Sequence, residues 1–125
     1  MSFYAFSQYY NWILFSFIYN NKKREGGALH YIDPDVENTQ PVMFLELGFA
    51  PSALNSTQKD VLWAGAWHGM YKINITTKKI IKLNGIPNVQ VRGIFTNSPT
   101  QVWGCTYGKG FFLHRDNKTI QFPLD

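Results

Sequence analysis

Short segments rich in apolar and aromatic residues recur along the chain from residue 51 onward, and turn-forming residues stand between them. Such segments predict β-strands, because wide side chains pack well on a pleated surface, and no stretch shows the sustained 3.6-residue apolar period of a helix. Glycine, proline, asparagine and aspartate cluster between the runs, where turns are expected. The predicted strands are 51–57, 61–67, 69–75 and 79–84, followed by 90–96, 101–107, 110–115 and 119–123.

The two groups of predicted strands are copies of one unit. Residues 62–65 (LWAG) match 102–105 (VWGC) at a shift of 40, and residues 69–71 (GMY) match 110–112 (GFF) at a shift of 41. The extra residue falls in the loop 107–110, and insertions confined to loops are expected in a repeated fold.

A weaker third copy opens the chain. Residues 5–6 match 53–54 at a shift of 48, while Asp33 matches Asn74 at a shift of 41. The seven extra residues fall in 20–26, which predicts an enlarged hairpin loop there. The alternative is a membrane anchor over 12–19 with the basic residues 22–24 as its stop, but a span needs about 20 mostly apolar residues.

Three units of about forty residues with four strands each predict a β-propeller, whose blades are four-stranded. We expect an all-β fold, a partial β-propeller of three four-stranded antiparallel blades, in one domain over 1–125 with repeats at about 1–48, 49–88 and 89–125. Trp63 and Trp103 are then expected to fill gaps between neighbouring blades. Gly69 and Gly110 are expected to take a positive φ after tight loops.

The stretch 61–74 (VLWAGAWHGMYKIN) resembles the two-component regulator propeller repeat, which reads roughly Leu-Trp-x-Gly-Thr, a short loop, Gly-Leu-Tyr-Arg and an aspartate turn. Residues 102–115 resemble it more loosely, and 28–34 resemble its second half. The resemblance implies the periplasmic sensor domain of bacterial hybrid histidine kinases, which detects carbohydrates in two-component signal transduction. These 125 residues do not include the further blades or the kinase, receiver and DNA-binding parts of such sensors.

In a propeller, ligands bind where the loops between the second and third strands meet the connections between blades. Exposed aromatic rings beside hydrogen-bond donors suit a small molecule or an oligosaccharide. For the aromatic residues the alternative is blade-to-blade packing, and for the charged ones it is a solvated loop. The predicted ligand-binding residues are Trp67, His68, Tyr107, Lys109, Asn88 and Arg92.

Motifs for catalysis are absent from the sequence, which contains neither HExxH nor GxSxG. We therefore expect no enzyme activity, no cofactor and no metal. His30 and His114 are expected to be polar residues on strand faces, and the single Cys105 to be a small buried apolar residue. The net charge of +4 is spread along the chain, so no nucleic-acid partner is expected.

Three blades cannot close a ring, because propellers normally have four to eight. The expected partners are therefore further blades in the same polypeptide or a second copy in a homodimer, with membrane contact only through an anchor outside these residues. The predicted function is a ligand-sensing, carbohydrate-binding propeller segment of a periplasmic bacterial signalling protein. The alternative is a protein–protein interaction propeller without a small-molecule ligand.

Overall fold

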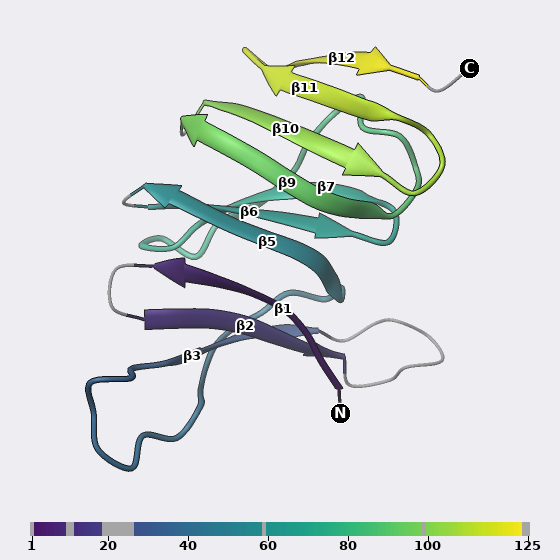
Figure 1. Ribbon diagram of the computed structural model, residues 1–125. Coiled ribbons are helices and arrows are strands. Elements are labelled where there is room, and N and C mark those ends of the chain that lie inside the picture. Colours follow the sequence, from purple (N-terminus) through teal and green to yellow (C-terminus); the bar gives the residue numbers. More distant parts are fainter. Residues whose placement is uncertain (1, 10–11, 19–26, 59, 99, 124–125) are drawn as a thin grey trace.

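The chain folds into three antiparallel sheets of four strands each (Figure 1). The computed structural model describes residues 2–9, 12–18, 27–58, 60–98 and 100–123, and among these no helix occurs. The first sheet contains β1 (Ser2–Tyr9), β2 (Trp12–Ile18), β3 (Ala28–Ile32) and β4 (Val42–Glu46). The second contains β5 (Pro51–Gln58), β6 (Val61–Ala66), β7 (Gly69–Asn74) and β8 (Ile80–Lys82). The third contains β9 (Val91–Ser98), β10 (Gln101–Thr106), β11 (Phe111–Arg115) and β12 (Lys118–Phe122).

The expectation of an all-β chain is confirmed, and the eight strands expected after residue 50 lie within two residues of their predicted bounds. Within each sheet, each strand pairs antiparallel with the strand that follows it in the sequence. The predicted enlarged loop over 20–26 lies outside the described residues. Residues 12–18, the alternative anchor, form β2, and no helix of the described chain is long and apolar enough to cross a membrane.

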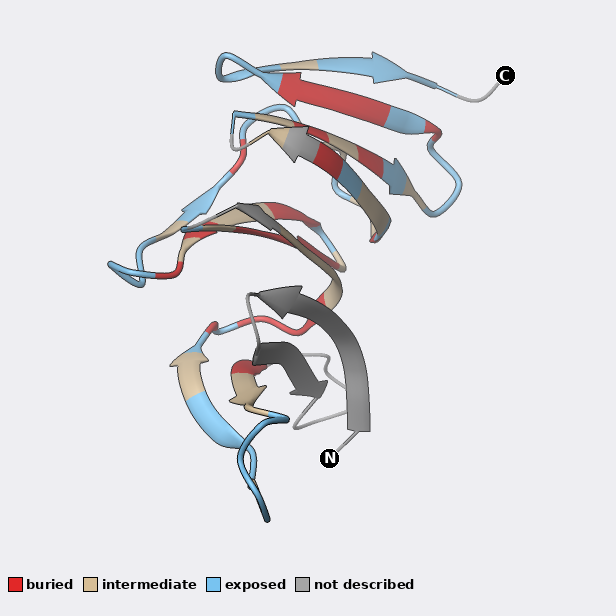
Figure 2. Ribbon diagram, turned by 60° about the vertical axis from the view of Figure 1, so that its left-hand side comes forward, coloured by how far each residue is buried: buried red, intermediate tan, exposed pale blue. Residues whose placement is uncertain are grey.

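The three sheets stand one against the next, with their first strands side by side (Figures 1 and 2). β5 lies between β1 and β9. Two apolar cores fill the spaces between the sheets. The core between the first and second sheets includes Leu29, Phe49, Leu62 and Ile73. The core between the second and third sheets consists of Trp63, Met70, Leu83, Val91, Val102 and Phe112.

Two glycines make room in the core between the second and third sheets. A Cβ atom on Gly65 would lie 2.9 Å from the nearest methyl carbon of Val91, on the facing strand. Gly104 pairs with Phe112, and a Cβ atom there would overlap the phenyl ring. The ring of Phe112 therefore lies across β10 only because residue 104 has no side chain.

Polar side chains fasten the same two sheets along their inner strands. The hydroxyl of Ser52 donates to the carbonyl of Val91 at 2.6 Å, and the amide of Asn55 donates to the carbonyl of Ile94 at 3.1 Å. These part-buried donors and acceptors have lost water as a partner, so leaving them unpaired would cost free energy. A shift of one sheet along the other would break both bonds, and the bonds therefore favour the observed register.

The tight turns have the backbone geometry that the sequence predicts. Gly69 and Gly110 have positive φ values of 141° and 81°. Asp116 and Asn117 form the two-residue loop between β11 and β12 with φ values of 53° and 61°. Two consecutive positive φ values are typical of a type I′ hairpin turn, which matches the twist of the flanking strands.

The far face of the third sheet is uncovered among the described residues, and it overturns two expectations. Trp63 is buried between sheets as expected, but Trp103 is only half-buried on this far face. Cys105 is exposed and not buried, because it lies two residues after Trp103 on the same strand and therefore points to the same face.

Candidate functional site

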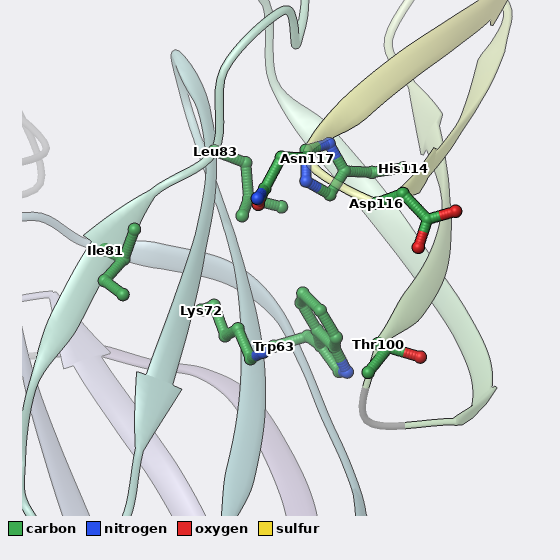
Figure 3. Close-up of a pocket in the computed structure, with 8 residues that line it drawn as sticks. All are labelled: Trp63, Lys72, Ile81, Leu83, Thr100, His114, Asp116 and Asn117. Carbon is green, nitrogen blue, oxygen red and sulfur yellow. The ribbon is translucent and has the colours of Figure 1, made fainter.

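A cavity of about 260 Å³ opens between the second and third sheets (Figure 3). It lies at the end of the sheets where β9 turns into β10 and β11 turns into β12. Cavities for drug-sized ligands measure about 300–1,000 Å³. This one therefore suits a single small ring or a short chain. Its walls consist of Trp63, Lys72, Ile81, Leu83, Thr100, His114, Asp116 and Asn117.

Trp63 forms the most deeply buried part of the wall. It stands on β6 and is 1% exposed. Its indole nitrogen is buried and has no hydrogen-bond acceptor among the described residues. Figure 3 shows this nitrogen on the side of the ring where Thr100 lies. A buried N–H without an acceptor costs free energy. Because this nitrogen is closed off from solvent, a guest molecule could accept its hydrogen bond, and so remove that cost, only after the side chains around it shift.

Lys72 supplies the positive charge of the cavity. It pairs with Trp63 across β6 and β7, and its ammonium nitrogen lies 5.4 Å from the centroid of the indole ring. That distance is within the range of a cation–π interaction. The ammonium group keeps hydrogen atoms to donate, because the ring face satisfies its charge and not its hydrogen bonds.

His114 contributes an acceptor. The hydroxyl of Thr119 donates its one hydrogen to the carbonyl of Asn84 at 2.7 Å, and the same oxygen lies 2.8 Å from Nδ1 of His114. Nδ1 must therefore carry the hydrogen, which leaves Nε2 as an acceptor. Burial first, and the charge of Lys72 second, lower the pKa of His114 below its ordinary value of 6.5. The ring is neutral at pH 7.

Turn residues of the third sheet complete the rim. The type I′ turn places Asp116 and Asn117 at the cavity mouth, and Thr100 reaches it from the turn between β9 and β10. The hydroxyl of Thr100 lies 3.0 Å from that of Ser98, which fixes its position. Carboxylate, amide and hydroxyl groups thus lie on the third-sheet side of the cavity, and the apolar side chains of Ile81 and Leu83 line the second-sheet side (Figure 3).

Taken together, the cavity offers donors and acceptors of both kinds around an aromatic and aliphatic floor. One cation and one anion face it, so its charges balance. The described residues contain no group of three metal-ligating side chains.

The predicted ligand-binding residues lie at the opposite end of the sheets, and none of them lines this cavity. His68 is exposed on the turn between β6 and β7, and its Nε2 lies 3.3 Å from the hydroxyl of Tyr71. The ring of Tyr71 stacks on Phe49 at 4.0 Å between centroids, and burial raises the pKa of Tyr71. Trp67, beside His68, is half-buried.

The other predicted residues gather at the matching corner of the third sheet. The ring of Tyr107 is 66% exposed, and the guanidinium carbon of Arg92 lies 5.4 Å from its centroid. Lys109 is exposed in the same loop as Tyr107, and Asn88 is exposed in the connection between β8 and β9. The structure therefore brings Arg92 and Tyr107 together, and the role of these six residues stays a prediction.

Sequence reasoning missed the cavity because its walls come from two repeats. It assigned Trp63 to packing and Asp116-Asn117 to a turn, and both assignments hold. The available signal was Lys72, a charged residue within the mainly apolar segment 69–73, in the repeat that contains Trp63. A charged residue among apolar ones can indicate a ligand-binding site.

Compared with models of known protein families and with curated proteins, the chain matches none.

Proposed function

We propose that the chain is a three-bladed segment of a β-propeller that binds a small polyhydroxylated ligand, of the carbohydrate class, and performs no catalysis. In this proposal the three sheets are successive blades, since each repeats the same strand order and adjoins the next through its first strand. The observation that carries the ligand is the buried N–H of Trp63 in the wall of a cavity.

The chemistry of the cavity supports a polyol over a charged ligand. Each hydroxyl of a sugar both donates and accepts a hydrogen bond. Trp63 and Lys72 would donate to such a ligand, Asp116 and His114 would accept from it, and Asn117 would do both. A carboxylate ligand would meet the charge of Asp116, and a cationic ligand would meet that of Lys72.

The experiment is a thermal-shift and calorimetric screen of monosaccharides and short oligosaccharides against the purified chain. A ligand that binds the folded state raises its melting temperature, and the rise continues with the logarithm of the ligand concentration once this exceeds the Kd. The informative variant is Trp63→Phe, which keeps an aromatic ring but removes the N–H group. We expect the affinity to fall about tenfold, since one buried hydrogen bond is worth about 1.4 kcal/mol.

Trp103→Phe is the matched control, because it makes the same change at the equivalent repeat position, outside the cavity. Its affinity should equal that of the unchanged chain. Equal losses in both variants would place the ligand elsewhere, and Tyr107→Ala would then test the predicted loop residues. A broad sugar panel that leaves the melting temperature unmoved would overturn the carbohydrate proposal.

The cellular role is proposed on the resemblance of residues 61–74 alone. It supports a periplasmic sensor segment in bacterial two-component signalling. Cell fractionation tests this location, and recovery of the native protein in the cytoplasm would contradict it.

A second candidate function, a protein–protein interaction propeller, is favoured by a different observation. The far face of the third sheet carries exposed aromatic side chains, among them Phe95, Phe111 and Phe122. Exposed apolar surface of this kind marks interaction sites.

A further inference from the structure

The third sheet presents an apolar face that spans all four of its strands, which we name the Trp103 face. Strand pairing aligns its residues in two rows, and neither row contains a charge. The first row consists of Phe95, Trp103, Leu113 and Ile120, and the second of Gly93, Cys105, Phe111 and Phe122.

The rings on the Trp103 face are held in place by the strand register. Phe111 pairs directly with Phe122, and their rings stack with centroids 4.9 Å apart. Trp103 lies 6.1 Å from the first ring and 5.9 Å from the second. Phe95 is nevertheless 65% exposed and Phe111 47% exposed. An ordered aromatic surface that remains open to water is a docking surface.

The internal repeat indicates what covers such a face. Trp63 and Met70 are the counterparts of Trp103 and Phe111 one repeat earlier, and the third sheet buries both of them. The residues that cover them, such as Val91, Val102 and Phe112, belong to the near face of the following sheet. The surface that fits the Trp103 face is therefore the corresponding near face of another sheet of this fold.

We propose that a second copy of this chain covers the Trp103 face with the outer face of its first sheet. A two-fold axis repeats the contact, so that two chains close a ring of six sheets. The inference rests on the proposed blade arrangement and is independent of the ligand, because a chain that binds no sugar can still pair. On the outer face of the first sheet, Ile32 and Met43 are uncharged, and Met43 is 54% exposed.

Charge complementarity supports this partner. One end of the Trp103 face carries Arg115 and Lys118, which pair beside the β11–β12 turn and are exposed. In the contact between the second and third sheets, that turn lies over the face that contains Trp63. The β3–β4 connection of the first sheet is the counterpart of the β11–β12 turn, since each joins the third and fourth strands of its sheet. In the proposed dimer, the β3–β4 connection of the partner copy would therefore lie over the end of the Trp103 face that carries Arg115 and Lys118. This connection carries the exposed acidic residues Asp35 and Glu37.

Sedimentation velocity on the full chain tests the proposal directly. A dimer of twice 14.4 kDa is expected, and Phe111→Lys should reduce it to a monomer by placing a charge at the centre of the contact. Val42→Lys, which adds the same charge at an exposed apolar position of β4 on the face toward the second sheet, should remain dimeric. Circular dichroism confirms that each variant is folded. A folded wild-type chain that stays monomeric at all concentrations would overturn the proposal.

Cys105 gives a second readout that needs no substitution. Its thiol lies on the Trp103 face, so a thiol reagent should label it at least tenfold more slowly when the protein is concentrated enough to pair. A labelling rate that does not change with protein concentration would contradict coverage of this face.

The identity of the covering surface is tested by exchanging charges. Arg115→Glu should weaken the dimer about tenfold or more, and adding Asp35→Arg to the same chain should restore it. If two Trp103 faces met each other instead, mild oxidation would join the two Cys105 thiols into a covalent dimer. That product, or a failure of the double variant to recover, would overturn the six-sheet ring.

Discussion

Trp63 and Trp103 occupy the same position of the same repeat, on the second strand of neighbouring sheets, yet their surroundings differ. Trp63 is buried by the third sheet and forms the wall of a cavity. Trp103 is half-buried and lies in a cluster with two partly exposed phenylalanine rings. The difference shows that the next sheet, and not the repeat's own sequence, decides whether its central aromatic residue is core or surface. In repeat proteins each unit completes the core of its neighbour.

The largest predicted effect separates these two tryptophans. Trp63→Ala should lower the free energy of unfolding by about 3–5 kcal/mol, because it opens a void in a closed core. Trp103→Ala should cost clearly less at protein concentrations below those at which chains pair, since its ring keeps contact with water. Urea denaturation of both variants measures the difference. Equal costs would show that Trp103 is covered within a single chain.

The second prediction compares two glycines of the third sheet on opposite faces. Gly104→Ala should destabilise the chain by about 1–3 kcal/mol, because its Cβ atom overlaps the ring of Phe112 in the closed core. Gly93→Ala should cost less. Its Cβ atom would lie 2.8 Å from the sulfur of Cys105, an exposed side chain that can rotate away. Thermal unfolding followed by circular dichroism distinguishes them, and the opposite ranking would contradict the assignment of faces.

The third prediction concerns the lysine above Trp63. Lys72→Gln should lower the free energy of unfolding by about 0.5–1 kcal/mol through loss of the cation–π contact. It should also weaken binding of any ligand that takes the cavity. Arg92→Gln, which removes a similar contact with Tyr107 at the other end of the sheets, is the control for the second effect. A Lys72→Gln variant that binds as tightly as the parent would remove Lys72 from the site.

The smallest effect is a pH dependence of the free energy of unfolding, which we expect from His114 on the buried face of the third sheet. The pKa of His114 is lower in the folded chain than its ordinary value of 6.5, because of burial and then Lys72. The unfolded chain therefore binds a proton more readily, and stability that is complete above pH 6.5 declines as the pH falls below it. Urea titrations between pH 7.5 and 5 should show this decline, and His114→Gln should reduce it. An unchanged slope in that variant would assign the decline to other groups.

The sequence predicted the strands well because their signal is local. Short apolar and aromatic runs and the turn residues around Gly108 and Asp116 act over a few positions, and a short connection such as 116–117 brings the strands on either side of it together. The equivalence of residues 62–65 with 102–105 also identified Trp63 as a packing residue.

The cavity and the exposed face could not be predicted in the same way, because they depend on contacts between repeats. Lys72 and Asp116 are 44 positions apart, and no spacing in one repeat relates them. Cys105 was expected in the core since a small thiol is usually buried there. Because side chains alternate between the two faces of a strand, Cys105 lies on the same face as Trp103. The local sequence does not show whether another sheet covers that face.

The hydrogen bonds from Ser52 and Asn55 both reach a carbonyl that lies 39 positions further along the chain. The separation is about one repeat, so the bonding pattern has the period of the fold itself. The third repeat has Arg92 and Phe95 at the equivalent positions, so the donors themselves are not repeated. A copy of the second repeat would bring its own Ser and Asn donors, and the sheet that follows such a copy would meet ready-made bonding partners at the joint.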